Sequence, residues 1–245
     1  ADGTFEAIGS TVTLDSGGAI NLEPAAGSAI LLDGTISVDA GVVTGATSIT
    51  STALVGALTG NASTASTAAA AAGMRGAYSS RAECWRQYMG QKMKVNSHMV
   101  FGSEHEEDAR HDGEIAISAL SFPTGLFIHR EHDWLGASPD GEFLQLGLHE
   151  IKCRNSEPYS AISPQHMAQI QVQLACADYD QCIFQSWTPI RQRIWLVPRS
   201  AGYWKWLLPL LEEFWQYVIN QQPPPTVRPR RIAPIDIQSE IIYEG

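Results

Sequence analysis

Three residues in the middle of the chain, Asp140, Glu150 and Lys152, have the types and the spacing for phosphodiester chemistry. Asp140 lies in a Pro-Asp-Gly turn, and Glu150-Ile-Lys-Cys follows ten residues later. Because side chains alternate along a strand, Glu150 and Lys152 share one face while Ile151 and Cys153 face a core. A hairpin can bring Asp140 beside Glu150. Two carboxylates suit Mg²⁺, which prefers oxygen ligands, and a lysine can orient a water or offset charge in the transition state.

Neither pattern is specific by itself. An acidic and a basic residue alternating on a strand are more often a solvated face, and Pro-Asp-Gly is more often only a turn. Two further motifs flank the pair in order. Residues 102–110 read Gly-Ser-Glu-His-Glu-Glu-Asp-Ala-Arg, and residues 166–171 read His-Met-Ala-Gln-Ile-Gln. Four motifs in this order are much less expected by chance than any one of them, and together they support a phosphodiester-cleaving site.

These motifs resemble those of the lambda-exonuclease/YqaJ-type viral recombinase nucleases, within the restriction-endonuclease-like PD-(D/E)xK superfamily. The resemblance covers residues 76–220. It implies a metal, Mg²⁺ with Mn²⁺ as the alternative, held by Glu106, Asp140 and Glu150. It further implies that Lys152 assists the attacking water and that Gln169 lies at the active site. The implied fold is α/β, with a mixed-sheet core flanked by helices.

Two of these residues keep a bland alternative. Glu106 stands among other acidic residues, so a solvated helix start is the competing interpretation, although its spacing from Gly102 selects it. Gln169 shares a helical stripe with Gln165 and Gln173 at four-residue spacing, which is also typical of a plain polar face.

Contacts to nucleic acid are expected from Ser138, Arg75 and Arg81. Ser138 either contacts phosphate or only shapes the Asp140 turn. Members of the family carry a longer DNA-end-binding segment before the Glu106 helix. Here a stretch without Lys or Arg stands in that place, so Arg75, Arg81 and Arg86 are the candidates to replace it. Arg228, Arg230 and Arg231 form a basic cluster near the end of the chain, which either touches phosphates or is a solvated tail.

Two other pairs of possible metal ligands give weaker evidence for a site. His129 and His132 have His-x-x-His spacing, but on the strand expected there their rings point to opposite faces, which disfavours zinc. His149 and Cys153 share the strand face opposite Glu150, where core packing is the favoured interpretation.

Composition divides the chain near residue 74. Residues 1–74 contain no Lys or Arg, and all 16 basic residues follow them, within a chain of formal net charge −10. We therefore expect a Gly/Ala/Ser/Thr-rich segment over 1–74, a nuclease-type domain over 75–225 and a Pro- and Arg-containing tail over 226–245. Short alternating apolar runs between Gly turns predict a β-rich start of phage-fibre texture, running into low complexity over 44–72. The bland alternative is a disordered linker.

Within 75–225 the periodicity predicts helices over 81–93, 104–116, 163–176 and 201–220. Strands are expected over 127–134, 144–153, 182–187 and 191–197. Ser163 before Pro164 is a strong helix start, and Pro209 lies inside the last helix.

Several classes are disfavoured. The sequence has no apolar run long enough to span a membrane and no basic start before an apolar stretch, so neither a membrane nor a secretory signal is expected. The four cysteines lack Cys-x-x-Cys spacing and are typical of reduced thiols.

Three functions remain. The leading hypothesis is a Mg²⁺-dependent DNA nuclease, a 5′→3′ exonuclease on double-stranded DNA in phage-type recombination. The resemblance implies a homotrimer, a single-strand annealing partner protein and the cytoplasm of a phage-infected bacterium. The second is a trimeric virion fibre protein with a nuclease-fold C-terminal domain. The third is an endonuclease with the same core.

Overall fold

The computed structural model describes residues 64–91, 97–225 and 230–245. The chain divides into two units, residues 1–45 and 46–245, and every described residue belongs to the second. The β-rich, fibre-like segment expected at the start of the chain lies outside the described residues as far as residue 63. None of the described helices is both long and apolar enough to cross a membrane.

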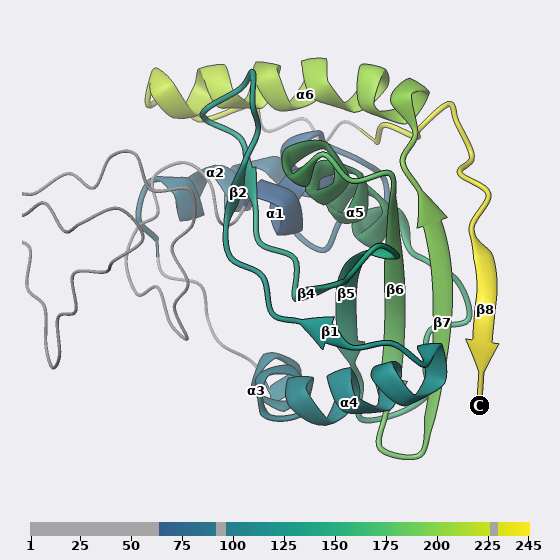
Figure 1. Cartoon of the computed structure of the whole chain (residues 1–245). Helices are drawn as coiled ribbons and strands as arrows, with labels where there is room; N and C mark the ends of the chain where they lie inside the picture. Colours follow the sequence, from purple (N-terminus) through teal and green to yellow (C-terminus); the bar gives the residue numbers. More distant parts are fainter. Residues whose placement is uncertain (1–63, 92–96, 226–229) are drawn as a thin grey trace, which may run out of the picture. The chain divides into compact units, whose positions relative to one another are not determined.

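A six-stranded mixed sheet forms the centre of this unit (Figure 1). Its strands, in spatial order, are β1 (Ser121–Phe122), β4 (Gly141–Phe143), β5 (Gly147–Cys153), β6 (Gln181–Thr188), β7 (Arg191–Pro198) and β8 (Glu240–Glu244). The β5–β6 pair is parallel and the other neighbours are antiparallel. A separate two-stranded sheet joins β2 (Phe127–Ile128) to β3 (Gly136–Ala137). The expected mixed α/β fold is confirmed.

Helices cover both faces of the sheet, as Figure 1 shows. They are α1 (Thr64–Ala71), α2 (Arg81–Tyr88), α3 (Ser97–Glu104), α4 (Glu106–Ile117), α5 (Pro164–Ala177) and α6 (Ala201–Ile219). Because neighbouring strand residues point to opposite faces, Phe184 and Trp195 pack on the α5–α6 side. Ile151 and Trp187 pack against Ala109 of α4 on the other side. The strand that carries Glu150 and Lys152 is thus enclosed between two layers.

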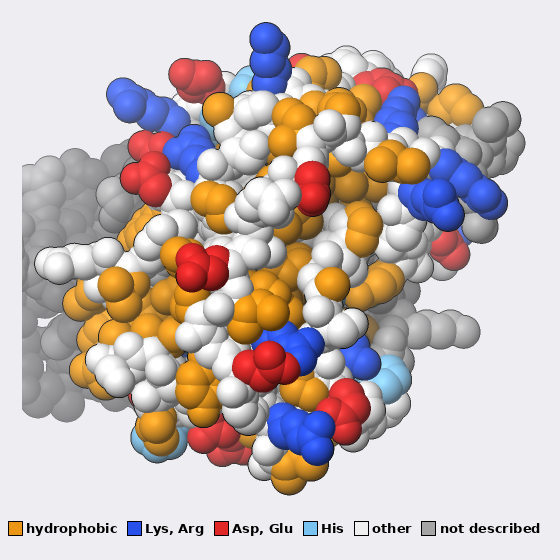
Figure 2. All heavy atoms as spheres, turned by 90° about the vertical axis from the view of Figure 1, so that its right-hand side faces the viewer, with side chains coloured by type: hydrophobic (Ala, Val, Ile, Leu, Met, Phe, Trp, Pro, Cys, Tyr) orange, Lys and Arg blue, Asp and Glu red, His pale blue; other side chains and the backbone are white. Residues whose placement is uncertain are grey.

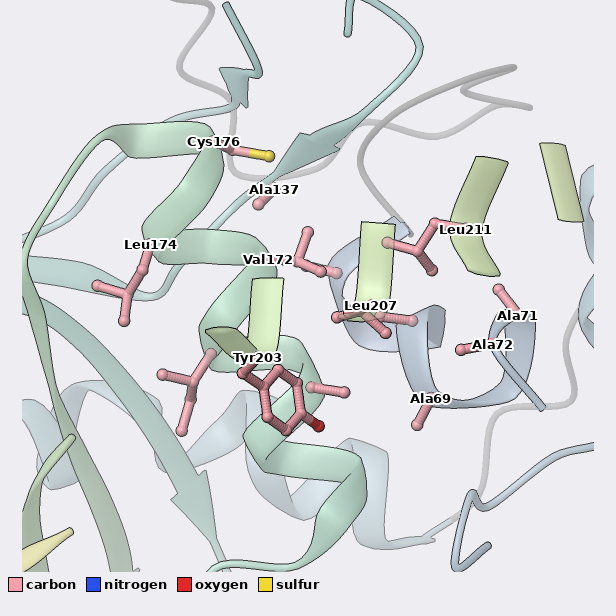
Figure 3. Packing of buried hydrophobic residues seen from close by; sticks show 14 of the residues in the cluster. Ala69, Ala71, Ala72, Ala137, Val172, Leu174, Cys176, Tyr203, Leu207 and Leu211 are labelled. Carbon is pink, nitrogen blue, oxygen red and sulfur yellow. The ribbon is translucent and has the colours of Figure 1, made fainter. Parts of the chain in front are cut away.

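The low-complexity end of the first segment is part of the core. Ala68 and Ala69 of α1 are fully buried, in one cluster with Leu207, Leu211 and Tyr203 of α6 (Figure 3). Alanine supplies high helix propensity and a surface small enough for close approach of a neighbouring helix. The expected boundary at 74/75 is therefore wrong, since the globular domain already includes residues 64–74.

The chain after residue 229 also belongs to the domain. β8 pairs with β7 and forms an edge of the sheet, and the main chain of Arg231 is hydrogen-bonded to that of Gly73 and Arg75. The Arg231 guanidinium donates to Ala72 O and pairs with Glu213. Figure 2 looks onto this edge and shows hydrophobic side chains among charged ones. The expectation of a separate tail over 226–245 is wrong for the residues described.

Most expected elements are confirmed, with corrected ends. Ser163 accepts from the N–H of His166 and caps α5, and α6 continues through Pro209 to its C-cap at Asn220. The expected helix over 81–93 ends at Tyr88 and the helix over 104–116 begins at Glu106, after the separate α3. The expected strand over 127–134 is wrong beyond Ile128, because the chain bends at residues 130–131 and turns at residues 133–134.

The strand expected over 144–153 begins only at Gly147. This glycine has φ +132° and lies against the carbonyl oxygen of Gln181 at the start of β6. A side chain would overlap that oxygen, and few residues with a side chain adopt this φ. The β4–β5 hairpin therefore turns over residues 144–146 and enters β5 through a position that suits only glycine.

Candidate active site

The Asp140 carboxylate lies beside β5 at the point where β4 has not yet begun. β4 pairs with β5 from Gly141, opposite His149, to Phe143, opposite Gly147. The next outward N–H on that edge of β5 belongs to Ile151, and it donates to Asp140 Oδ2 at 2.6 Å. A main-chain donor of β5 thus fixes the carboxylate of the residue that precedes β4. Ser138, earlier in the same turn, is exposed, with its hydroxyl 3.4 Å from Gly125 O.

Glu150 is buried, and both of its carboxylate oxygens accept hydrogen bonds. Gln169 Nε2 donates to Oε1 at 2.7 Å, and Gln173 Nε2 donates to Oε2 at 2.5 Å. Lys152, on the same face of β5, forms an ion pair with Oε1. Gln169 and Gln173 are one turn apart on α5, so the glutamine stripe lies against β5 and is not a solvated polar face. Gln173 was not among the expected site residues, although its four-residue spacing from Gln169 was the available signal.

The charges of this group act on one another. Burial, and then the nearby carboxylates of Glu150 and Glu106, raise the pKa of Asp140 to about 8, against the opposing influence of Lys152. Burial alone lowers the pKa of Lys152, but Glu150 and Asp140 outweigh it and raise that pKa above its usual range. Lys152 is therefore an ammonium at neutral pH. The raised pKa of Asp140 shows that two ionised carboxylates are unfavourable here beside a single ammonium. The oxygen-rich donor set fits a divalent cation, whose binding would displace the proton from Asp140.

Glu106 lies near this group but has its own partner. It is the first residue of α4, about half exposed, and its carboxylate pairs with Arg110 Nη2 at 3.2 Å. Arg110 is buried beneath Gly141, where a side chain on the glycine would collide with the guanidinium. Across the described ranges, no three His, Cys, Asp or Glu side chains form a ready-made metal cluster. The structure thus brings Asp140, Glu150, Lys152 and Gln169 together. Glu106 lies at the edge of this group and is paired with Arg110.

The two arginines expected to contact nucleic acid have different positions. Arg75 is exposed in the loop after α1. Arg81 is buried, donates through Nε to Ala71 O at 2.8 Å and pairs with Glu213 at 3.1 Å. Its guanidinium also lies over the rings of Phe214 and Tyr217. The expectation of a phosphate contact from Arg81 is therefore wrong, because this side chain joins α1, α2 and α6.

The histidines also differ from one expectation. His129 and His132 lie outside the short strand, and their rings are 4.9 Å apart rather than on opposite faces. His149 is fully buried, with Nδ1 2.8 Å from Ser121 Oγ and Nε2 2.8 Å from Gln185 Oε1. Burial lowers the pKa of His149 to about 3, so its ring is neutral. Its partners are those of a core histidine, as expected.

Replacing Gln173 by Leu should weaken binding of a divalent cation by about 10–100-fold, because Glu150 Oε2 would lose the donor that orients it. Isothermal titration calorimetry with Mn²⁺ measures this change. Gln171→Leu is the matched control, since Gln171 is buried on the same helix but bonds to Pro198 O and Ser200 N–H. Equal affinities of the Gln173 and Gln171 variants would contradict the role of Gln173.

A mixed sheet with helices on both faces, and an acidic group beside one lysine at its centre, define a domain of the restriction-endonuclease-like class. The family model of the YqaJ-like viral recombinase domain matches residues 58–180, about half of the chain. The chain belongs to this family. The match starts before α1, so the stretch that composition assigned to an appendage includes part of the family domain.

Solved structures share this fold. An alkaline exonuclease from Laribacter hongkongensis, LHK-Exo, is 26% identical with a TM-score of 0.54, over 64% of this chain and 87% of that one. The same enzyme in complex with dAMP gives 23% identity and a TM-score of 0.58, over 67% and 90% of the two chains. No curated protein matches the chain. Family and fold together support a nuclease of the phage recombination type.

Proposed function

We propose that the chain is a divalent-metal-dependent DNA nuclease that degrades double-stranded DNA as a 5′→3′ exonuclease in phage-type recombination. The observation that carries the proposal is the grouping of Asp140, Glu150 and Lys152 at the β4–β5 hairpin. The 26% identity to an alkaline exonuclease supports removal of nucleotides from an end over internal cutting. The proposed setting is the cytoplasm of a phage-infected bacterium, with a homotrimer and a single-strand annealing protein as proposed partners.

The proposed metal ligands are Asp140 and Glu150, with Glu106 as the third once it leaves Arg110. Mg²⁺, or Mn²⁺ in its place, would polarise the phosphate and make a bound water more acidic. The buried Glu150 keeps both oxygens oriented through Gln169 and Gln173. The Lys152 ammonium holds the attacking water and offsets negative charge that develops on the phosphate.

Linear duplex DNA labelled at either the 5′ or the 3′ end tests the proposal. We expect ordered release of mononucleotides from the 5′ end with Mg²⁺, no release with EDTA, and none from Asp140→Asn. The exposed Glu131→Gln, which also converts a carboxylate to an amide, should match the parent protein. Degradation that is independent of metal or unaffected at Asp140 would overturn the site. Internal cuts would favour the endonuclease hypothesis. A protein that folds but cleaves no DNA would favour the hypothesis of a structural virion protein.

A further inference from the structure

His166, in the first turn of α5, has a buried ring nitrogen without a hydrogen-bond partner. The residue is only 3% exposed, and among the described residues nothing donates to or accepts from its Nδ1 atom. The other ring nitrogen, Nε2, lies 3.3 Å from the Tyr78 hydroxyl. Buried polar atoms are nearly always hydrogen-bonded, so an unpartnered one needs a physical reason. His166 is three residues before Gln169, on the helix that orients Glu150.

Three aromatic rings pack around this imidazole. The rings of Tyr159 and Phe184 lie 4.9 Å and 5.4 Å from the His166 ring, between centroids. The Tyr78 ring meets it edge-on, with centroids 5.8 Å apart. Because these contacts and the Tyr78 hydroxyl hold the ring, Nδ1 cannot simply turn toward solvent to find water as a partner.

The imidazole packs on the face of the sheet that carries Lys152. In the parallel β5–β6 ladder, Phe184 is the partner of Glu150 and Ser186 is the partner of Lys152. Paired residues in a ladder point to the same face of the sheet. The N–H of Tyr159 donates to Ser186 Oγ at 2.9 Å. The two residues nearest the imidazole, Tyr159 and Phe184, are thus attached to β6 directly beside the catalytic group.

Two cations act on the imidazole. Burial, and then the charges of Lys152 and Arg154, lower the pKa of His166 to about 3, so the ring is neutral and one nitrogen carries a lone pair. Which nitrogen carries it is set by the hydrogen bond that the other one makes. When Nε2 donates to the Tyr78 oxygen, the lone pair is on Nδ1, as nearby positive charge favours. Arg154 is already engaged, since its guanidinium lies over the Tyr159 ring at 4.0 Å.

The Lys152 ammonium has donors that are not yet used. It carries three hydrogens, and among the described residues Glu150 is its one hydrogen-bond partner. Gln169 donates to the same Oε1 atom of Glu150. As a metal ligand, Glu150 would have less negative charge to offer the ammonium. A second acceptor would then keep Lys152 in place, and Nδ1 of His166 is a buried acceptor that lacks a donor.

We propose that His166 is a positioning residue for Lys152, whose ammonium donates to Nδ1 when Glu150 binds the divalent cation. This contact keeps another hydrogen of the ammonium directed at the attacking water. The inference rests on the proposed nuclease function and adds a second acceptor for Lys152. His166 acts through Lys152 and touches neither the metal nor the phosphate. Loss of the acceptor should therefore slow the chemical step and leave binding of DNA intact.

Nitrogen NMR of the histidine rings tests the hydrogen bond without measuring activity. The signals of His166 are identified by their loss in His166→Phe. We expect Nδ1 to be the unprotonated nitrogen in the metal-free protein. Its signal should move upfield when Mg²⁺ is added, because a lone pair that accepts a hydrogen bond is more shielded. In Lys152→Met, which has no donor, the Mg²⁺-dependent shift should be absent. A protonated Nδ1, or an equal shift in Lys152→Met, would overturn the proposal.

Two amide replacements separate the roles of the two ring nitrogens. An asparagine amide lies near the position of Nδ1, and a glutamine amide lies near that of Nε2. His166→Phe and His166→Gln should lower the single-turnover rate at saturating DNA by about 10–100-fold, with an unchanged KM for DNA. His166→Asn should recover most of this rate. An undiminished rate in His166→Phe, or recovery by Gln and not by Asn, would contradict the role of Nδ1.

Failure of the nuclease function would give a different result from failure of this inference. A parent protein that binds no Mg²⁺ by calorimetry and cleaves no DNA would contradict the nuclease function itself. A parent protein that binds Mg²⁺ and cleaves DNA, but whose Nδ1 signal does not move, would contradict only the role of His166. Urea unfolding shows whether each variant is folded. Should His166→Asn fail to fold, the NMR comparison of the parent protein with Lys152→Met still decides the outcome.

Discussion

Glu150→Gln should lower the rate of DNA cleavage on the order of 10³-fold and also destabilise the protein by about 1–3 kcal/mol. Three donors converge on the two oxygens of Glu150, from Gln169, Gln173 and Lys152. A glutamine offers one acceptor and one NH₂ group, so at least one donor of the site would face another donor. Because Glu150 is only 1% exposed, water cannot relieve that conflict. The variant should therefore lose a proposed metal ligand and a buried hydrogen bond in one step.

Urea unfolding and single-turnover cleavage measure the two effects separately. Adding Gln173→Glu to Glu150→Gln returns a carboxylate to the neighbouring position and should recover most of the lost stability. Cleavage should stay low, since the carboxylate then projects from α5 rather than from β5. Full activity of the Glu150→Gln variant in Mg²⁺ would contradict the assignment of Glu150 as a ligand. Unchanged stability would contradict the converging donors.

Gly147→Ala should destabilise the protein by about 3 kcal/mol or more, because it combines an unfavourable φ with an overlap between the new methyl group and the Gln181 carbonyl. The overlap is with main chain, which cannot rotate away as a side chain can. The change occurs where β5 meets β6, three residues before Glu150. A shifted β5 should therefore also reduce cleavage.

Gly102→Ala is the matched control for the glycine prediction. Gly102 lies in α3, without a positive φ, and a methyl group there meets no atom within 4 Å. Alanine in a helix should be neutral or stabilising by up to about 1 kcal/mol. Chemical denaturation of both variants measures the difference. Similar unfolding free energies for the two variants would show that the β5 entry tolerates a side chain.

The elements that the sequence predicted well are those with local causes. Ser163 and Pro164 specify the start of α5 through a cap and a fixed φ, and both are adjacent in the chain. The shared face of Glu150 and Lys152 follows from strand alternation alone. The position of Asp140 beside β5 follows from a short hairpin, although the hairpin's turn lies over 144–146 rather than at Asp140. The chemical roles of these residues remain predictions.

The elements that the sequence did not predict depend on distant partners. β8 is a strand because β7 offers it an edge, and the chain between them includes the whole of α6. The composition of α1 did not predict a helix, since an uncharged run of alanine, serine and threonine is as typical of a linker as of a packed helix. Arg81 resembled a phosphate ligand until Glu213, far along the chain, was seen to pair with it. Glu106 was selected by its motif, but its pairing with Arg110 required the folded α4.

The alanine-rich composition of α1 limits which amino-acid substitutions this helix accepts. Ala68 and Ala69 are at 0% exposure, so each added methylene would have to displace a neighbouring core side chain at a cost of about 1–3 kcal/mol. The repeated alanines of α1 therefore limit which substitutions the domain accepts, and larger residues at these positions should be removed by selection. A search that discards repetitive sequence as uninformative would therefore discard some of the most constrained positions in the domain.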